Sequence, residues 1–489
     1  MTSNSFLSPS VEDSIPSDPL LNTAKTTFGT NYLFPYQRLV VSNVLEGRDQ
    51  IVVLPTGAGK SFCFLLPAAL LDGLTVIVYP LRSLIADQAR RLSTGSINAE
   101  SLTGETPQSE RKALFGRCAN GETRILLTNP EMLIQPRVRN ALESCRIAHL
   151  VIDEAHVLPE WGQTFRPAYL DFAKSARDLD ANIISAFTAT ASPAILKGLE
   201  EYLFADGPPH RVLGVPDRPN IHYSVRHVLS VRHEMYRLAI SEERPLLIFC
   251  RSRASAELTS ETLRADTGNR RIRFYHAGLE PEEKNDIERW FFDADDAVLA
   301  STCAYGMGVD KSNIRTVVHG EAPESVEAYL QETGRAGRDG APSKAIALSH
   351  IGPRRPREPN DDVQSARSEQ MHAYLAETQS CRRRFLLSLL GAPEIECTGC
   401  DVCDGTASRI ATHQAWIRKY VKRNARRYTA DEVGPRLRFK LARREGNRWT
   451  AIEIDEAIVT LTASGYIGPP KARVARLVFG NRLVPHRRQ

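Results

Sequence analysis

Short apolar segments alternate with helical segments through the first 350 of the 489 residues, and this alternation limits the possible folds most. Apolar strands separated by helices are typical of parallel sheets that are covered on both faces. The pattern forms two series, interrupted at the sequence DGPP at 206–209. It predicts two α/β domains. The predicted strands are Ile51–Leu54, Thr75–Val78, Ile125–Leu127, Leu150–Asp153 and Asn182–Phe187 in the first, and Leu246–Cys250, Arg271–Tyr275, Ala297–Ser301, Thr316–Val318 and Ala345–Leu348 in the second.

The remaining segments differ in composition from these two series. The N-terminal segment is polar and has no signal-peptide pattern, and the longest uncharged stretch is too polar to span a membrane. We therefore expect a soluble, intracellular chain without membrane contacts. The expected divisions are a tail over 1–30, α/β domains over 31–205 and 206–350, a cysteine-containing segment over 351–405, and a basic domain over 406–489.

The first predicted strand leads into the sequence PTGAGKS at 55–61 and then into a helix. Glycines in such a loop turn backbone N–H groups towards phosphate oxygens, and the helix N-terminus adds a positive dipole end. Lys60 supplies a charge for the β- and γ-phosphates, and the Ser61 hydroxyl is a Mg²⁺ ligand. The full phosphate-loop pattern has glycine where this chain has Leu54. A glycine-rich turn without a ligand is the alternative interpretation.

A pair of carboxylates, Asp153 and Glu154, follows a buried-type strand of the same predicted domain. A carboxylate at this place holds the water shell of Mg²⁺, and its neighbour orients and deprotonates the attacking water. Either residue alone is also a possible helix cap. Together with the phosphate loop, the pair predicts hydrolysis of a nucleoside triphosphate.

The sequence around these sites resembles the RecQ family of superfamily 2 helicases between Leu33 and Cys403. The FRPGQ motif of the family corresponds to Leu33–Gln37, with Phe34 in place of arginine. The other matching segments are Tyr79–Gln88, the DEAH box Asp153–His156, the aromatic-rich loop Trp161–Tyr169, Phe187–Ala191, Asp217–Asn220, Phe249–Arg253, Tyr275–Gly278, Ser301–Lys311 and Gln331–Gly340.

The resemblance implies two tandem RecA-like parallel-sheet domains, a helical zinc-binding subdomain and a short winged-helix-like domain. It implies catalytic roles for Glu154, Asp153, His156, Arg335 and Arg338, nucleotide contacts for Gln37, Thr56, Gly57, Gly59, Lys60, Ser61 and Gln331, and contacts to single-stranded DNA for Trp161, Phe165 and Arg166. Arginines of the second domain would neutralise charge on the γ-phosphate during transfer. Exposed aromatic rings would stack on unpaired bases.

Four cysteines have the spacing C-x15-C-x2-C-x2-C, at Cys381, Cys397, Cys400 and Cys403. Four thiolates close a tetrahedral structural Zn²⁺ site, with no open position for catalysis. An iron–sulfur cluster is the rival interpretation, since sets of four cysteines also hold such clusters. Four unliganded core cysteines are a further alternative. The resemblance favours zinc.

The C-terminal domain is strongly basic, because residues 404–489 contain 19 lysines and arginines against 7 aspartates and glutamates. This charge predicts a polyanion partner, although an arginine-rich solvated surface is an alternative. Helices are expected over Gln414–Arg427, Ala430–Arg444 and Ala451–Ser464, with a break or delay at Gly434-Pro435 in the second. A wing hairpin is expected from 474–479 and 482–484. Because the third helix carries acidic residues, DNA contacts are expected from the earlier helices and the wing.

We therefore expect an ATP-dependent DNA helicase with ATP, Mg²⁺ and Zn²⁺ as cofactors. Its partner would be single-stranded and junction or duplex DNA, in repair and recombination. Translocation from 3′ to 5′ is implied by the resemblance alone. The location would be the cytoplasm at the nucleoid in a bacterium, or the nucleus in a eukaryote. An RNA helicase or remodelling ATPase with the same motor is one alternative, and a nucleic-acid-binding protein with an inactive motor is another.

Overall fold

The computed structural model describes residues 18–162, 168–205, 207–302, 311–351, 362–445, 448–469 and 481–485. The chain forms two compact units. The first contains most of the chain up to Leu213, and the second contains the chain from Gly214 onwards with two short segments, 53–57 and 189–197. Within the described ranges, no helix has both the length and the apolarity that a membrane span requires.

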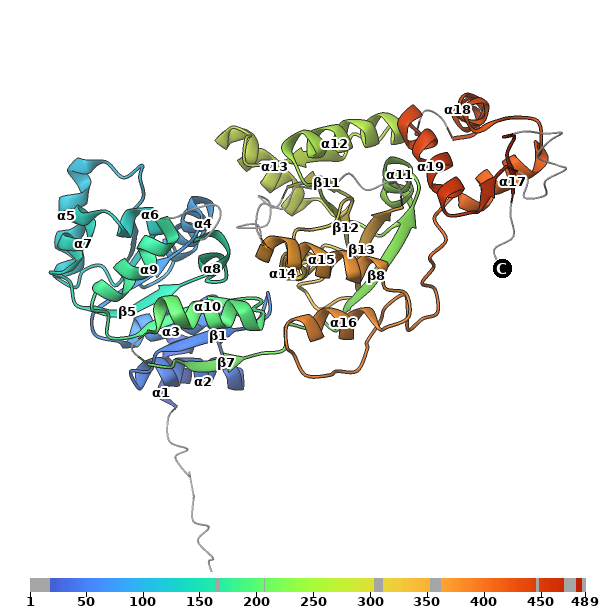
Figure 1. Ribbon diagram of the computed structural model, residues 1–489. Coiled ribbons are helices and arrows are strands. Elements are labelled where there is room, and N and C mark those ends of the chain that lie inside the picture. Colours follow the sequence, from blue (N-terminus) through green and yellow to red (C-terminus); the bar gives the residue numbers. More distant parts are fainter. Residues whose placement is uncertain are drawn as a thin grey trace, which may run out of the picture. The chain divides into compact units, whose positions relative to one another are not determined.

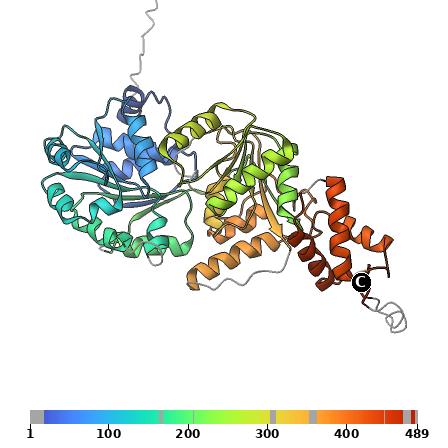
Figure 2. The same ribbon diagram turned by 90° about the horizontal axis from the view of Figure 1, so that it is seen from above.

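The first unit is built on a seven-stranded sheet with the order β3-β4-β2-β5-β6-β1-β7. Helices flank both faces of the sheet (Figures 1 and 2). Its strands are β1 (Gln50–Val53), β2 (Leu74–Val78), β3 (Ala99–Ser101), β4 (Ile125–Thr128), β5 (Ile147–Ile152), β6 (Ile184–Thr188) and β7 (His210–Leu213). The helices are α1 (Pro19–Phe28), α2 (Pro35–Leu45), α3 (Lys60–Leu70), α4 (Arg82–Leu92), α5 (Gln108–Ala119), α6 (Pro130–Leu133), α7 (Pro136–Leu142), α8 (Val157–Gly162), α9 (Ala168–Asp178) and α10 (Pro193–Leu203).

All five strands predicted for the first domain are present, and the pairs of β2 with β4 and β5 are parallel as expected. Strand β7 lies beyond the predicted boundary at 205 and yet belongs to this sheet. The His210 and Gly214 N–H groups donate to the Asp49 and Val53 carbonyls at 2.8 and 2.7 Å. The first unit therefore runs to Leu213. The sequence hid this strand because three of its four residues are exposed at the sheet edge.

The second unit is built on a six-stranded parallel sheet with the order β10-β11-β9-β12-β13-β8. Its strands are β8 (Ile221–Val228), β9 (Leu246–Phe249), β10 (Ile272–Tyr275), β11 (Val298–Ser301), β12 (Thr316–His319) and β13 (Ser343–His350). The helices are α11 (Val231–Ser241), α12 (Arg253–Thr267), α13 (Pro281–Asp293), α14 (Val326–Thr333), α15 (Asp362–Ala376) and α16 (Arg382–Leu389). The five predicted strands are confirmed, and β8 is an addition.

The cysteine-containing segment shares its core with this second α/β domain. Tyr374, Leu386 and Cys400 are buried in one apolar cluster with Leu247 and Phe291. Strand β8 forms the edge of the sheet, and the loop with the cysteines pairs with it. The Tyr223 N–H donates to the Gly399 carbonyl at 3.4 Å, and the Asp401 N–H donates to the Tyr223 carbonyl at 3.0 Å. The segment is therefore integrated into the domain that precedes it.

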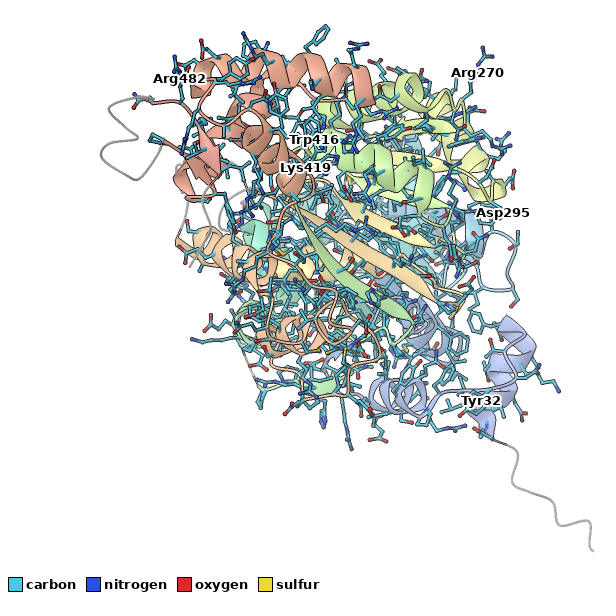
Figure 3. The ribbon with its side chains drawn as sticks, turned by 90° about the vertical axis from the view of Figure 1, so that its right-hand side faces the viewer. Tyr32, Arg270, Asp295, Trp416, Lys419 and Arg482 are labelled. Carbon is cyan, nitrogen blue, oxygen red and sulfur yellow. The ribbon has the colours of Figure 1, made fainter. Side chains whose placement is uncertain are left out.

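The C-terminal helices α17 (Gln414–Arg423), α18 (Ala430–Glu445) and α19 (Ala451–Ala463) surround a small core of their own. Figure 3 shows this part of the second unit, with Trp416 and Lys419 of α17 labelled. The predicted capping box of α19 is confirmed, because the Glu453 N–H donates to Thr450 Oγ1 at 3.1 Å. The predicted break at Gly434-Pro435 is wrong, since α18 runs through both residues. Burial of Val433, Leu437 and Leu441 on one helical face outweighs the lost hydrogen bond at the proline.

The short strands β14 (Ile467–Gly468) and β15 (Val484–Pro485) form an antiparallel pair. Val484 thus lies opposite Gly468, whereas the predicted wing paired 482–484 with 474–479. Residues 474–479 lie outside the described residues.

Candidate functional site

The phosphate loop connects β1 to α3 in a conformation that requires glycine. Gly57 and Gly59 have φ angles of 88° and 75°, which side chains rarely adopt. A Cβ atom added at Gly59 would lie 2.7 Å from the Gln37 amide nitrogen. Gly59 is the N-cap of α3, so Lys60 and Ser61 occupy the first turn of that helix. This arrangement suits an anion at a helix N-terminus.

The start of α2 is hydrogen-bonded to the phosphate loop. The hydroxyl of Tyr36 and the Gln37 amide nitrogen both donate to the Ala58 carbonyl, at 3.1 and 3.3 Å. The Gln37 amide oxygen accepts from the Phe34 N–H at 3.1 Å. Gln37, expected to read adenine, therefore also links α2 to the loop.

Aromatic rings form a shelf beside these hydrogen bonds. The rings of Phe34 and Tyr36 are stacked, with centroids 5.4 Å apart and planes 7° apart. Tyr32 meets Phe34 edge to face at 5.2 Å. Phe34 and Tyr32 are 50% and 61% exposed. The residue that replaces the arginine of the family motif is thus an exposed ring, suited to stacking on a base.

The two carboxylates of the DEAH box follow the end of β5. Glu154 has a φ angle of 51°, a strained backbone conformation that is typical of functional sites. Its N–H donates to Asp153 Oδ1 at 3.0 Å. Burial, together with the charge of Glu154, raises the pKa of Asp153 to about 7, and the charge of Lys60 opposes this rise. A cation bound beside Asp153 would lower the pKa of this carboxyl further, as the charge of Lys60 does.

His156 of the same box connects the carboxylates to β6. Its Nδ1 lies 3.0 Å from Thr188 Oγ1 and 3.5 Å from Glu154 Oε2. Thr188 belongs to the segment Phe187–Ala191, which matches a further family motif. The structure therefore gathers four of the predicted residues, Lys60, Asp153, Glu154 and His156, around one site in the first unit.

The predicted arginines of the second unit lie in a turn that follows α14. Gln331 lies in α14, and Arg335 and Arg338 occupy the turn. Gly337 within this turn has a φ angle of 54°. A Cβ atom there would lie 2.4 Å from Ser343 Oγ, so the turn requires glycine at this position. We call residues 334–338 the arginine turn.

Two residues of the Asp217–Asn220 element hold the arginine turn. The Arg218 guanidinium donates to the carbonyls of Ala336 and Gly337, at 3.1 and 2.7 Å. Asn220 Nδ2 donates to the carbonyls of Gly337 and Ala341, both at 2.8 Å. In the sequence this element is recognisable only as a segment that matches the family. Its hydrogen-bonding role has no signal in the local sequence pattern.

The residues expected to contact DNA lie at the edge of the described chain. Trp161 lies in α8, but its side chain lies outside the described residues. Phe165 and Arg166 also lie outside them, as do residues 303–310 of the motif Ser301–Lys311.

The four clustered cysteines meet at one point in the second unit. The sulfur atoms of Cys381, Cys397, Cys400 and Cys403 all lie within 4.8 Å of one another. Sulfur atoms on one tetrahedral Zn²⁺ ion lie about 3.8 Å apart, given Zn–S distances of about 2.3 Å. Four sulfurs that share one ion lie closer together than sulfurs spread around a cluster of several irons. The geometry therefore fits a single zinc ion.

Three family models match this chain. DEAD/DEAH box helicase matches residues 34–197, helicase conserved C-terminal domain matches 230–340, and RecQ zinc-binding matches 345–404. The third model covers all four cysteines, so this region is a zinc-binding domain of the RecQ type.

Curated relatives are similar to this chain over most of its length. ATP-dependent DNA helicase RecQ of Pasteurella multocida is 32% identical over 394 residues, which cover 78% of this chain and 62% of that protein. Putative ATP-dependent DNA helicase Q1 of Caenorhabditis briggsae is 31% identical over 441 residues, which cover 83% of this chain and 69% of that protein. The chain thus spans less than two thirds of the bacterial relative.

A solved structure supports the fold. The helicase MrfA bound to DNA superposes with a TM-score of 0.58 at 21% identity, over 75% of this chain and 55% of that chain. The three family models together cover the phosphate loop, the DEAH carboxylates, the arginine turn and the cysteine cluster. The chain belongs to the RecQ family of helicases.

Proposed function

We propose that the protein is an ATP-dependent DNA helicase that couples ATP hydrolysis to movement along single-stranded DNA, from 3′ to 5′, and to duplex unwinding. The observation that carries this proposal is the position of Lys60 in the first turn of α3, directly after the glycine-dependent phosphate loop and within electrostatic reach of the Asp153 carboxyl. The strained backbone of Glu154 next to the half-buried Asp153 argues against a decayed motor. The names of the relatives also support DNA as the partner and ATP as the hydrolysed substrate.

In this mechanism Lys60 and the loop N–H groups bind the phosphates of ATP. Ser61 and Asp153 would hold Mg²⁺, which supplies charge neutralisation on the phosphates. The Asp153 carboxyl fits this role, because a nearby cation lowers the pKa that burial has raised. Glu154 accepts a proton from the attacking water. Arg335 or Arg338 stabilises the charge on the transferred phosphoryl group.

Two regions are proposed to contact DNA. Close to the DEAH box, the rings of Trp161 and Phe165 would stack on unpaired bases, and Arg166 would bind a phosphate of the same strand. The second region is the basic aromatic surface, which we define as Trp416, Tyr428, Arg436, Phe439, Lys440, Arg443 and Arg444 of α17, α18 and the connection between them. Arg436 lies 4.2 Å from the ring centroid of Tyr428, and Arg444 lies 5.5 Å from that of Trp416.

Helix α19 carries acidic residues instead of basic ones, so phosphate contacts are expected from α17 and α18 and not from α19. Glu453 at the start of α19 accepts a hydrogen bond of 2.8 Å from Ser230 of the α/β domain. Asp455 on the same helix is exposed. Phosphates repel such a helix and are attracted to clustered lysine and arginine. We further propose a role in repair and recombination, at the nucleoid or in the nucleus.

Strand displacement with DNA and RNA duplexes side by side tests the proposal. We expect ATP-dependent unwinding of DNA that carries a 3′ single-stranded tail, and little unwinding of RNA. Lys60→Ala should abolish hydrolysis and unwinding but leave DNA binding intact, because the loop and the strand-binding surfaces use different residues. Equal activity on RNA would favour the RNA helicase alternative. Turnover by Lys60→Ala at the wild-type rate would refute the site.

A further inference from the structure

Two adjacent arginines of α16 are almost completely buried, although charged side chains are rarely buried without partners. Arg382 is 0% exposed and Arg383 is 1% exposed. The next residue, Arg384, pairs with Glu394 at the surface. Two buried guanidinium groups on one short helix require strong local partners, and these partners lie in two different places.

Arg382 serves the loop of the cysteine cluster. Its Nε and Nη2 donate to the two carboxylate oxygens of Asp401, at 2.9 and 3.3 Å. Its Nη1 donates to the Tyr374 carbonyl at 2.8 Å. Because Asp401 lies between Cys400 and Cys403, this arginine fixes the metal loop itself.

Arg383 holds the segment that leads into β8. It forms an ion pair with Asp217 and donates to the carbonyls of Arg218 and Ile221, at 3.0 and 2.6 Å. Its guanidinium lies over the ring of Tyr223, 5.1 Å from the centroid. Arg383 therefore fixes the backbone of the residue whose own side chain holds the arginine turn.

The Arg218 side chain completes the connection. Its Nη1 donates to the Gly334 carbonyl at 2.8 Å, in addition to the bonds to Ala336 and Gly337. Three carbonyls on both sides of Arg335 thus point to one guanidinium. Their orientation sets the path of the backbone that presents Arg335 and Arg338.

We propose that Arg383 and Arg218 are positioning residues that carry the state of the cysteine cluster to the arginine turn. Helix α16 starts directly after Cys381, so a metal ion held by this cysteine fixes the start of the helix that carries Arg383. Loading of the metal site then sets the turnover rate of ATP hydrolysis. The proposal rests on the proposed function, in which the arginine turn acts on the transferred phosphate.

Arg383→Lys in the full chain tests the first link, with Arg384→Lys as the matched control on the same helix. Lysine keeps the charge but cannot bond Asp217 and two carbonyls together. We expect kcat to fall roughly 10- to 100-fold, because small misplacements of a catalytic group are this costly. The KM for ATP should change less than kcat, since none of the groups that Arg383 bonds lies in the phosphate loop, while the control keeps both constants. One zinc per chain should remain bound.

A wild-type kcat in a folded Arg383→Lys protein would overturn the proposal. Asp217→Asn provides a second variant in case Arg383→Lys fails to fold, and it should lower kcat in the same way. We call this coupling of the cysteine cluster to the arginine turn the relay. Loss of zinc from either variant, with kcat at the wild-type value, would likewise contradict the relay.

Hydrogen exchange gives a readout that does not depend on activity. Removal of zinc from the wild-type protein by a chelator should speed amide exchange in a peptide that covers 334–341, while a peptide over β2 in the first unit stays unchanged. Unchanged exchange at 334–341 would refute the relay. A wild-type protein without ATPase activity would instead refute the proposed function and leave the exchange result to judge the relay.

Discussion

The hydroxyl of Tyr36 donates a hydrogen bond of 3.1 Å to the Ala58 carbonyl in the middle of the phosphate loop. In a trans peptide the C=O and N–H groups point in opposite directions. A carbonyl held towards Tyr36 therefore turns the Gly59 N–H away from it. Tyr36 also stacks on Phe34, so one residue links the ring cluster of Tyr32, Phe34 and Tyr36 to the phosphate loop.

Tyr36→Phe should raise the KM for ATP about fivefold and leave kcat unchanged. The variant keeps the stacked ring and loses one hydrogen bond, which contributes about 1 kcal/mol. Steady-state ATPase kinetics measure this effect. Tyr32→Phe, which removes a hydroxyl from an exposed ring of the same shelf, is the control and should change neither constant. An unchanged KM in Tyr36→Phe would show that the loop holds its shape without the tyrosine.

The raised pKa of Asp153 predicts a pH dependence of stability. The pKa of this carboxyl is about 7 in the folded chain and about 4 in an unfolded one, so the folded chain binds more protons between these values. This contribution to the free energy of unfolding is present below about pH 4 and is lost as the pH rises towards 7. Calorimetry should show that wild type loses stability relative to Asp153→Asn over this range. Parallel curves for the two proteins would contradict the prediction.

The same carboxyl must be ionised to hold Mg²⁺. The affinity for Mg²⁺–nucleotide should therefore fall as the pH drops below 7, and equilibrium titration with a non-hydrolysable ATP analogue measures it. The Mg²⁺-free affinity provides the control and should change less.

Trp161→Ala should reduce the stimulation of ATPase by single-stranded DNA more than the DNA-free rate. Base stacking contributes about 1–3 kcal/mol per ring and serves here as a coupling signal. ATPase rates with and without an oligonucleotide test this. If the rates with and without the oligonucleotide fall equally, Trp161 packs within the loop and does not couple DNA binding to hydrolysis.

Replacement of Arg436, Lys440 and Arg443 by glutamine should weaken duplex binding and make it less salt-dependent. Each lost phosphate contact removes about 0.9 from the slope of log affinity against log salt. All three side chains are exposed, so the fold should persist. A control variant that replaces Lys112, Arg270 and Arg289 removes the same charge from other exposed positions. If both variants change the slope equally, the basic aromatic surface has no special role.

One equivalent of zinc should copurify with the protein, and Cys400→Ser should lower the melting temperature. Binding free energy at a closed thiolate site contributes to folding, and Cys400 is fully buried in the core of the second unit. Metal analysis and calorimetry measure the two effects. Iron with visible absorbance would favour a cluster, and a metal-free protein would leave the four cysteines unexplained.

The sequence predicted most of the fold because its strands are apolar throughout. Strand β8 escaped prediction since its residues alternate between buried and half-buried, as at Ile221 and His222. Helix α18 continues through Pro435 because the packing of Leu437 and Leu441 decides its course. Local sequence preference carries no information about such tertiary contacts.

The catalytic motifs were predictable, but the residues that hold them were not. Lys60 and Asp153 are recognisable from spacing, since phosphate and metal chemistry allow few alternatives. Arg382 and Arg383 look like surface charges in the sequence. Their burial depends on Asp401, 19 residues from Arg382, and on Asp217, 166 residues from Arg383, and the partners meet only in the folded protein.

The pairing of the cysteine loop with β8 has a consequence for the behaviour of the protein in solution. An edge strand with free N–H and C=O groups is a template for association with another chain. Here Gly399 and Asp401 occupy these groups at Tyr223. Loss of a metal ion from the cysteine cluster would release the loop and uncover the strand, so zinc would also protect the protein from aggregation through its sheet edge.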